Sequence, residues 1–556
     1  MNKPVSSHDS PGPAAGSRTS ILCVSAAVFA ATLLPLLLFL RRCTPFAETS
    51  VFQPDAFYYL TVARNSLHTP FYSFDGVHPT NGFHPVWQYM LYHAMRLNLL
   101  RPDDPFLTLH RLYIGNLVIL SIAWALLAAF AARHLHRKWL AFPTVCPGFL
   151  WFVVALTAFQ YLANWSYLNG MESSVELLFL GLALLCFSTG RTAALRLPLS
   201  MFFFGLMVLS RLDDVFLLLP VLLLVWKSHG EGPRRRAAVA LALPIVMIAA
   251  YLVYNRISVG VFMPTSGSVK AGLGFSQNLY HTYHLVAPGR WSQLVVTGDA
   301  GYSETFMRIF QMLGPMALCG IYLVRRGRSP WGLIEALCVG VLLKGAYNFI
   351  NVRTFYQGSW YFGSSIFMAN LVIALMWDRT VNLAHPVGRK ASPLRPWIAA
   401  LACGVLTAVC FNIYANHLMS HDAGRYQYNI LRQRDILRAM VQHEGSDRFI
   451  EMNDGELAYA TGMQTMSGQG LVLDPPAARA LASGHLFDIA SDRGFHLMMA
   501  CGLYKDLIDD FLQRRKAGDH LPIYKISGDE FDRFRVSAVA YDSVSDTKLY
   551  RISRNP

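Results

Sequence analysis

The stretch LPLSMFFFGLMVLSRLDDVFLLLPVLLLVWK, residues 197–227, decides the fold class of this chain. Two apolar runs, 197–210 and 214–227, flank the polar sequence Ser210-Arg211-Leu212-Asp213-Asp214. Apolar runs of this kind are typical of helices that cross the roughly 30 Å of hydrocarbon in a bilayer. The polar sequence interrupts what would otherwise be one long helix. We therefore predict two membrane spans that meet at this break.

Similar apolar runs recur along the first three quarters of the chain. Of the 556 residues, 53% are hydrophobic and only 15% are charged, whereas soluble proteins carry nearer a quarter charged residues. Hydropathy predicts about eleven transmembrane helices, near 20–40, 112–132, 144–163, 173–190, 197–210, 214–227, 237–255, 306–324, 330–350, 361–377 and 397–415. The expected fold class is a mainly α, polytopic membrane protein, with its transmembrane domain over residues 20–415.

The net charge of +14 is concentrated in short loops between alternate spans. These basic loops are 134–138, 191–196, 227–236, 325–328 and 379–395. By the positive-inside rule they face the cytoplasm, which predicts a multi-pass protein of the inner (cytoplasmic) membrane with a cytoplasmic N-terminus. Residues 1–19, rich in Ser, Pro, Gly and Ala, are expected to be a disordered cytoplasmic tail. Because the charge is divided among short loops, no nucleic acid is expected as a partner.

The large outward loop 41–111 carries the densest group of reactive side chains. Asp55 follows Pro54, as at the start of a helix, where an acid is favoured. Asp55 is then either only a cap or, as a partly desolvated carboxylate at the membrane interface, a general base. Helical stretches are expected at 55–67, which includes Tyr58, and at 85–99.

A second polar segment of the same loop begins with a turn at Asp75-Gly76. Residues at spacings of three follow it and would cluster on one side of the segment: His78, Asn81, His84 and Trp87. The two histidines would either bind a phosphate or a metal, or hydrogen-bond loop carbonyls. No HExxH or similar pattern supports a metal site.

Polar side chains also occur in two further outward loops, within one span and near the ends of others. The loop Met263-Pro-Thr-Ser-Gly-Ser-Val-Lys270 places Ser266 and Lys270 where they could cradle a phosphate, or where they only form a solvated interfacial loop. Arg353 lies among aromatic residues and could pair with a phosphate, whereas an aromatic belt alone would not explain it. Lys344 is a charge within a span, which predicts a function or a buried pair. The acids Glu172 and Asp213 could bind acceptor hydroxyls or a cation near a shared cavity, whereas the pair of Arg211 with Asp213 could equally be structural.

From about residue 416 the chain is polar to its end. Strands are predicted at 448–452, 521–526 and 535–541, and helices at 477–483, 485–490 and 505–515. Roughly 140 residues with both kinds of element suffice for a small domain. We therefore expect residues 416–556 to form an extracytoplasmic α/β domain without a catalytic motif of its own.

Several of these segments resemble the bacterial GT-C glycosyltransferases, in particular mycobacterial-type terminal arabinofuranosyltransferases and mannosyltransferase-like proteins. They are Asp-Ala-Phe-Tyr-Tyr at 55–59, Thr-Asn-Gly-Phe-His-Pro-Val-Trp at 80–87, Gly-Met-Glu at 170–172, Arg-Leu-Asp at 211–213 and Pro-Thr-Ser-Gly-Ser-Val-Lys at 264–270. The tail is similar to the outward C-terminal domain of that group. The resemblance runs through most of the chain, although its motifs are short.

The resemblance implies a transferase that moves a sugar, with inversion, from a polyprenyl-phosphate donor to an extracytoplasmic glycan, glycolipid or protein acceptor. It makes Asp55 the catalytic base. Where the family often has two adjacent acids, this chain has Pro54-Asp55, so Asp75 and Glu172 stand next in line for that role. The donor phosphate would be bound by cationic side chains, namely Lys270, Arg353, His84 and Lys344.

Acceptor or sugar binding is expected from Tyr58, Asp75, His78, Asn81, Trp87, Glu172, Asp213 and Ser266. No metal site is predicted, although the sequence leaves a requirement for Mg²⁺ or Mn²⁺ open. Two other functions are weighed against the transferase: a transporter or flippase of a lipid-linked glycan, and a non-catalytic membrane scaffold. The acids gather at span ends and no internal repeat is found, which disfavours the transporter.

Overall fold

The computed structural model describes the greater part of the chain in separate segments. The described residues are 22, 25–26, 28–30, 32–34, 37, 49, 51–135, 167–188, 195–228, 234–270, 274–286, 300–326, 331–352, 359–384, 422–453, 455–514, 526 and 528–555. The predicted tail 1–19 and the predicted spans 144–163 and 397–415 lie outside these residues, and most of the span 20–40 does as well.

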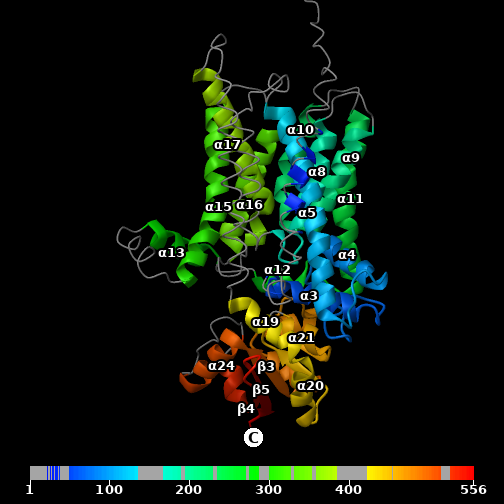
Figure 1. Ribbon diagram of the computed structural model, residues 1–556, viewed down its shortest axis with the longest axis vertical. Coiled ribbons are helices and arrows are strands. Elements are labelled where there is room, and N and C mark those ends of the chain that lie inside the picture. Colours follow the sequence, from blue (N-terminus) through cyan, green and yellow to red (C-terminus); the bar gives the residue numbers. More distant parts are fainter. Residues whose placement is uncertain are drawn as a thin grey trace, which may run out of the picture.

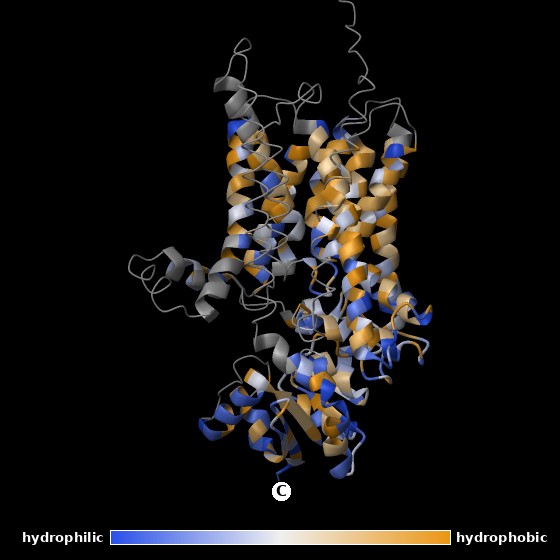
Figure 2. Ribbon diagram, viewed as in Figure 1, coloured by the Kyte–Doolittle hydropathy of each residue, from blue (hydrophilic) through white to orange (hydrophobic). Residues whose placement is uncertain are grey.

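Long apolar helices form a bundle that makes up the larger part of the molecule (Figure 1). They are α5 (Pro105–Leu135), α8 (Ser173–Ser188), α9 (Arg196–Ser210), α10 (Val215–Ser228), α11 (Arg234–Ser258), α15 (Ala300–Arg325), α16 (Leu333–Asn351) and α17 (Gly363–Ala384). α8 packs against α5 and α9, α10 packs against α16, and α15 packs against both α16 and α17. Hydrophobic residues dominate these helices along their length (Figure 2).

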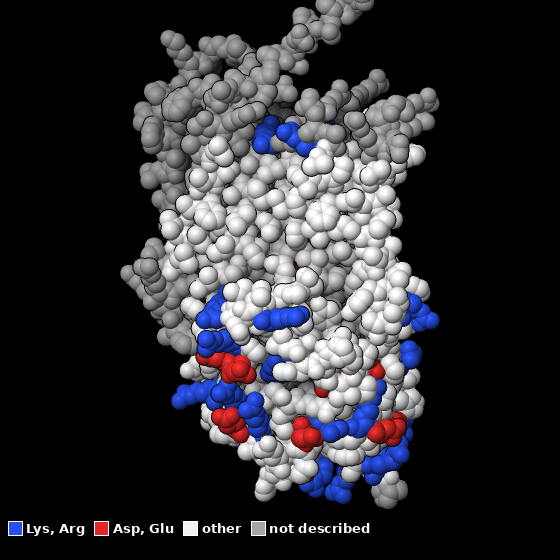
Figure 3. Space-filling model, turned by 90° about the vertical axis from the view of Figure 1, so that its right-hand side faces the viewer, with Lys and Arg blue, Asp and Glu red and all other residues white. Residues whose placement is uncertain are grey.

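Three of the described helices are long and apolar enough to cross a membrane: Pro105–Arg133, Ala237–Ser258 and Leu333–Asn351. Ser173–Phe187, Arg196–Ser210 and Gly363–Met376 are apolar but shorter. Figure 3 shows one face on which the described part of the bundle displays almost no charged side chains. The expected class, a mainly helical membrane protein followed by a C-terminal sheet, is confirmed. The number of eleven spans is not confirmed and stays a prediction.

The break predicted between the two spans at 197–227 is present. α9 ends at Ser210, Arg211 has an extended backbone, and a short 3-10 helix, η2 (Leu212–Asp214), leads into α10. The Arg211 side chain is fully buried, as is that of Asp214. The polar groups of the break are therefore turned into the protein, where they find charged partners.

At one end of the bundle lies a layer of short helices: α3 (Pro54–Asn65), α4 (Pro85–Arg96), α12 (Thr265–Lys270) and α13 (Gly274–Val286). α3 and α4 each begin with a proline, whose fixed backbone angle suits the first helical position. Both helices were predicted from the sequence. α3 buries most of its length, from Ala56 to Ala63.

The C-terminal domain, at the bottom of Figure 1, contains a five-stranded sheet with the strand order β2-β1-β3-β5-β4. β1 (Arg448–Glu451) pairs in parallel with β2 (Gln464–Ser467) and β3 (Leu497–Cys501). β5 (Thr547–Arg554) pairs antiparallel with β3 and with β4 (Phe534–Asp542). The helices of the domain are α19 (Asp422–Arg432), α20 (Arg434–His443), α21 (Glu456–Thr461), α22 (Pro475–Ala482), α23 (Leu486–Asp492), α24 (Gly502–Arg514) and α25 (Gly528–Arg533).

β1, β4, α22, α23 and α24 lie where strands and helices were predicted, and the predicted strand at 521–526 lies almost entirely outside the described residues. The strands β2, β3 and β5 and the helices α19, α20, α21 and α25 were not predicted. A hydrophobic cluster that includes Met498, Phe487 and Phe534 forms the core of the domain. β3 is buried at all five of its positions. The α/β character of the domain is thus observed directly.

The C-terminal domain is docked on α3. The Tyr58 hydroxyl donates to the Asn453 carbonyl oxygen at 3.1 Å, and the Arg64 guanidinium donates to the carbonyl oxygens of Tyr459 and Ala458 at 2.7 and 2.9 Å. One continuous hydrophobic core extends from the bundle through α3 into this domain. The two parts therefore enclose the space between them as a single structural unit.

Candidate active site

A cavity of about 320 Å³ lies between the helical bundle and the C-terminal domain. Its walls come from six separate parts of the chain: α3, the segment 82–88, residues 171–172, the break after α9, the loop 263–267 and the end of α16 with Tyr361. Leu471 and Val472 of the C-terminal domain close it on another side. Polar groups far apart in sequence thus meet in one hollow.

Asp55 lines this cavity from the first turn of α3. Pro54 occupies the first helical position and Gln53 is extended, so the helix begins directly at the carboxylate. The partial positive charge of a helix N-terminus favours the ionised form of such a group. His84 and Arg211 line the same cavity. The Asp55 residue therefore lines a hollow that also holds an imidazole and a guanidinium.

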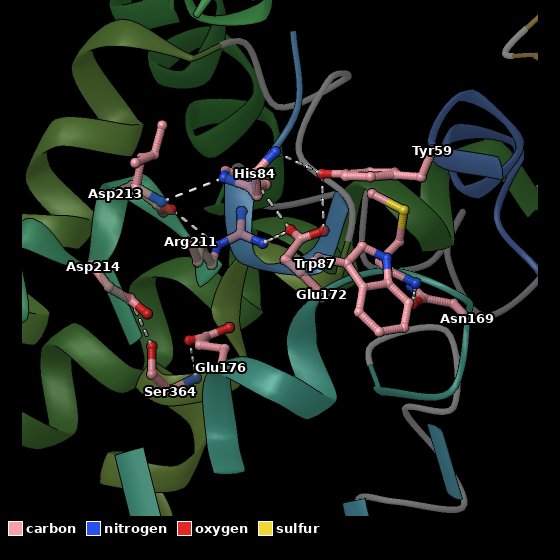
Figure 4. Close-up of polar contacts among 12 residues, drawn as sticks. Tyr59, His84, Trp87, Asn169, Glu172, Glu176, Arg211, Asp213, Asp214 and Ser364 are labelled. Atoms are coloured by element: carbon pink, nitrogen blue, oxygen red, sulfur yellow. Dashed lines mark hydrogen bonds and ion pairs between the residues drawn. The ribbon is translucent and has the colours of Figure 1, made fainter. Parts of the chain in front are cut away.

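Glu172 is the hub of a polar network beside the cavity (Figure 4). Its Oε1 accepts a hydrogen bond from Arg211 at 2.7 Å, and its Oε2 accepts one from the Tyr59 hydroxyl at 3.3 Å. Burial, together with the nearby Glu172 carboxylate, raises the pKa of Tyr59 well above its ordinary value. The phenol therefore keeps its proton and serves as a donor.

His84, the residue that directly precedes α4, belongs to the same network. Its Nδ1 accepts a hydrogen bond from the Leu212 backbone N–H at 3.4 Å, while its Nε2 lies 3.5 Å from Glu172 Oε1. Because Nδ1 is the acceptor, the neutral imidazole carries its proton on Nε2. About a quarter of the side chain is exposed, so His84 is accessible from the cavity and is fixed by the break after α9.

Arg211 connects this hub to the break. Its Nε lies 3.0 Å from Asp213 Oδ1, and its guanidinium lies 4.2 Å from the centre of the Tyr361 ring. Burial would raise the pKa of Asp213, but the charges of Arg211 and Lys344 outweigh it, and the resulting pKa is about 2. Asp213 is therefore an anion that holds Arg211 in place.

Lys344 lies within the protein behind the cavity wall and does not line the cavity. Its ammonium group donates to Asp214 at 2.5 Å and to Ser364 at 3.2 Å, and it lies 3.5 Å from Asp213. Glu176 is 3.9 Å away. Lys344 was predicted either to bind a donor phosphate or to form a buried ion pair. The structure shows the ion pair, because a buried charge requires such partners.

Two of the other predicted residues face the cavity. The Tyr58 ring lines it, although the hydroxyl is engaged by Asn453 and Ser467. Ser266 lines it from α12, next to Gly267. Lys270 ends the same helix, but its side chain is not among those described, and Arg353 follows the cavity-lining Val352 and lies outside the described residues.

Two more predicted residues connect parts of the protein without lining the cavity. The Asn81 side chain donates to the Met263 carbonyl and accepts from the Thr265 N–H. The Trp87 indole donates to the Gly170 carbonyl at 3.1 Å and is buried. Both side chains form hydrogen bonds with backbone groups. These contacts indicate a structural role, in place of the expected binding of sugar or acceptor.

Asp75 and His78 lie away from the cavity. His78 Nδ1 is 2.6 Å from Asp75 Oδ2, and Asp75 also accepts the backbone N–H groups of Val77 and His78. The turn faces the C-terminal domain near Asp474 and Arg493. The proposed acceptor-binding role of this pair, and Asp75 as a substitute base, are therefore not supported by its position. The alternative that His78 satisfies local groups fits the structure.

Several residues that line the cavity were not predicted as site residues: Tyr59, Gln88, Arg211, Asn348 and Tyr361. The position of Arg211 between two apolar spans could have indicated its importance, because an arginine there requires buried partners. Tyr59 lies one residue from the selected Tyr58. Gln88 and Asn348 carry no pattern that separates them from ordinary helix residues.

Within the described part of the chain, no group of three or more His, Cys, Asp or Glu side chains is arranged to hold a metal ion. The cavity brings together a carboxylate, an imidazole and a guanidinium, from Asp55, His84 and Arg211. A carboxylate can accept a proton, and arginine and imidazole N–H groups can stabilise negative charge that develops on a departing oxygen. The combination suits a displacement in which a hydroxyl attacks and an anion leaves.

No protein-family model matches this chain, and no curated protein matches it in sequence. Among solved structures, ArnT from Cupriavidus metallidurans bound to undecaprenyl phosphate is similar with a TM-score of 0.50 and 12% identity, over 97% of this chain and 98% of ArnT. The same protein in the apo state gives a TM-score of 0.45 and 12% identity, over 93% of this chain and 97% of the other.

The archaeal oligosaccharyltransferase AglB from Archaeoglobus fulgidus, in complex with an inhibitory peptide and a dolichol-phosphate, is similar with a TM-score of 0.47 and 12% identity. That alignment covers 97% of this chain and 74% of AglB. At such identities a likeness concerns the fold alone. The chain shares its overall fold, along nearly its full length, with the undecaprenyl-phosphate-bound ArnT structure.

Proposed function

We propose, from its GT-C-type membrane fold and the cavity beside the C-terminal domain, that this chain is an integral-membrane glycosyltransferase. Its donor would be a sugar linked to a polyprenyl phosphate. Its acceptor would be a glycan, a glycolipid or a protein of the cell envelope. The observation that carries the proposal is the shared cavity, in which Asp55 faces the same space as His84 and Arg211.

In the proposed reaction Asp55 is the general base. It takes the proton of an acceptor hydroxyl while that oxygen forms a bond to the anomeric carbon of the donor sugar. The bond between the anomeric carbon and the phosphate oxygen breaks, and its electron pair leaves with the polyprenyl phosphate. A single displacement of this kind inverts the anomeric configuration.

The leaving phosphate gains negative charge and requires cationic or hydrogen-bond donors more than a proton. His84 and Arg211 are the described groups that can supply them. We include Lys270 and Arg353 in this role because Lys270 follows the cavity-lining Gly267 by three positions and Arg353 directly follows the cavity-lining Val352. Glu172, Asp213 and Tyr59 are positioning residues, which fix the orientation of Arg211 and His84.

The membrane location follows from the apolar bundle. We propose that the cavity and the C-terminal domain lie on the non-cytoplasmic side of the inner membrane, because the sequence places the basic loops at the opposite ends of the spans. A polyprenyl chain would then rest between the lipid-facing helices while its phosphate reaches the cavity.

The test uses the purified full chain in proteoliposomes with a lipid extract that contains polyprenyl-phosphate-linked sugars and the natural envelope acceptors. Mass spectrometry follows the release of free polyprenyl phosphate and the appearance of glycosylated acceptor. The proposal predicts both, and no consumption of nucleotide sugars. Movement of intact lipid-linked sugar across the bilayer without release of polyprenyl phosphate would instead identify a transporter.

A further inference from the structure

A second hollow, of about 290 Å³, lies next to the cavity and shares Met263 and Pro264 with its lining. It runs between the loop 261–269 and α22 of the C-terminal domain. Most of its wall is apolar and comes from Val261, Pro264, Val269, Pro475, Ala478 and Leu481. We call this hollow the α22 groove.

The loop 261–269 forms the partition between the two hollows. Met263 and Pro264 line both of them, whereas Ser266 and Gly267 face only the cavity, and Thr265 and Val269 face only the α22 groove. The Met263 side chain is 66% exposed. Methionine is unbranched and flexible, so the Met263 side chain can change its rotamer at the boundary between the two hollows, which Pro264 also forms.

Apolar side chains are exposed at the end of α11, next to the loop that lines the α22 groove. α11, of which the apolar window is only 22% buried, ends at Ser258. Three large apolar side chains near its end are exposed, namely Ile257, Phe262 and Met263. Exposed apolar side chains in this arrangement mark a site of contact with lipid.

One charge lies at the groove. Arg479 lines it and is exposed, on the same face of α22 as Pro475 and Ala482. Apolar walls with a single arginine at the edge complement an amphiphile, in which an apolar chain adjoins an anionic group.

We infer that the α22 groove binds an acyl chain of the acceptor, and that the acceptor is therefore an anionic membrane amphiphile. The chain lies along Val261, Val269 and Leu481, with the anionic group at Arg479. The head group passes Met263 into the cavity, where its hydroxyl reaches Asp55. This inference rests on the proposed glycosyltransferase function, and it selects the glycolipid class among the proposed acceptors.

The direct test is photocrosslinking of the full chain in nanodiscs. The probes are phosphatidic acid and diacylglycerol, each with a diazirine in one acyl chain, and crosslinked peptides are mapped by mass spectrometry. Phosphatidic acid is expected to label residues 261–269 and 475–482, at least five times more strongly than diacylglycerol. Arg479→Gln should remove this preference, whereas Arg514→Gln, an exposed arginine of α24, should keep it.

Ala478→Phe is designed to fill the groove, with Ala480→Phe as its matched control because Ala480 is on α22 but does not line the groove. Crosslinking should fall at least five-fold in the first variant only, at an unchanged thermal unfolding midpoint. If Ala478→Phe unfolds the domain, the comparison of Arg479→Gln with Arg514→Gln tests the inference instead. Equal labelling by both probes, or labelling that leaves these two segments unmodified, would overturn the inference.

An activity measurement separates this inference from the proposed function. Ala478→Phe should lose transfer to the lipid acceptor while it still releases polyprenyl phosphate by donor hydrolysis. Unchanged transfer in this variant would reject the groove and leave the transferase intact. Absence of donor turnover in the wild-type chain would reject the transferase. The crosslinking experiment measures lipid binding in the α22 groove and does not depend on that activity.

Discussion

Arg211 and Glu172 form a buried ion pair with an N–O distance of 2.7 Å, and each side chain is about 1% exposed. The pair joins the break after α9 to the residue before α8, and the Tyr59 hydroxyl and His84 meet it at the same carboxylate. Since a buried charge without its partner is strongly destabilising, this pair holds the bundle together as well as shaping the cavity.

Replacing Glu172 with Gln should therefore reduce both stability and turnover. The variant leaves the Arg211 guanidinium with less negative charge nearby, at an expected cost of about 3 kcal/mol in the free energy of unfolding. Thermal unfolding in detergent measures the change. Asp435→Asn is the control, because Asp435 is 81% exposed in its ion pairs and such pairs contribute at most about 1 kcal/mol. Equal stability of the two variants would show that the buried pair is not needed.

Gly82 is expected to tolerate no side chain. A methyl group at this position would collide with the Leu471 carbonyl oxygen, which belongs to the backbone of the C-terminal domain. Gly82→Ala should therefore loosen the docking of that domain at a cost of roughly 1–3 kcal/mol. Hydrogen exchange should accelerate around residues 455–473. Gly115→Ala, a position with no neighbouring atom within 4 Å, should leave exchange unchanged. Unaltered exchange in both variants would contradict the tight contact.

Glu530 should make the stability of the C-terminal domain depend on pH. Burial raises the pKa of its carboxyl to about 7, although the Phe487 N–H and Arg533 act in the opposite direction. Because the folded-state pKa lies above the ordinary value of 4.5, folding favours the protonated form. The stabilisation is complete below pH 4.5 and is lost as the pH rises through about 7.

The expected decrease in unfolding free energy of this domain between pH 5 and pH 8 is on the order of 1–3 kcal/mol. Hydrogen exchange of the sheet in the full chain, measured over this pH range after correction for intrinsic rates, provides the test. Glu530→Gln keeps the acceptor for the Phe487 N–H, which Glu530 Oε1 receives at 2.7 Å, and should flatten the dependence. If the wild type and Glu530→Gln have the same pH profile, the pH dependence of stability arises from groups other than Glu530.

Local sequence signals predicted the elements of this fold well. The polar run at 210–214 marks the break between α9 and α10, and Pro54 and Pro85 mark the starts of α3 and α4. The alternation of strands and helices after residue 416 indicated the α/β domain. Each of these features depends only on residues that are close together in the chain, so it can be predicted from one sequence.

The partners of the polar groups could not be predicted in the same way. Lys344 pairs with Asp214 across 130 positions, and Tyr58 bonds Asn453 across 395. Asp75 and Asp55 lie in one predicted loop, yet only Asp55 faces the cavity. Which of the two acids lines the cavity follows from tertiary packing, and spacing along the chain carries no such information.

The most direct test of the central claim compares the Asp55→Asn and Asp75→Asn variants. The rate of sugar transfer from the polyprenyl-phosphate donor is measured in proteoliposomes under single-turnover conditions, with equal amounts of folded protein. Loss of a general base should slow Asp55→Asn by about 10²-fold or more, whereas Asp75→Asn, in a turn outside the cavity, should keep a rate close to that of the wild type. A wild-type rate in the Asp55→Asn variant would contradict the account.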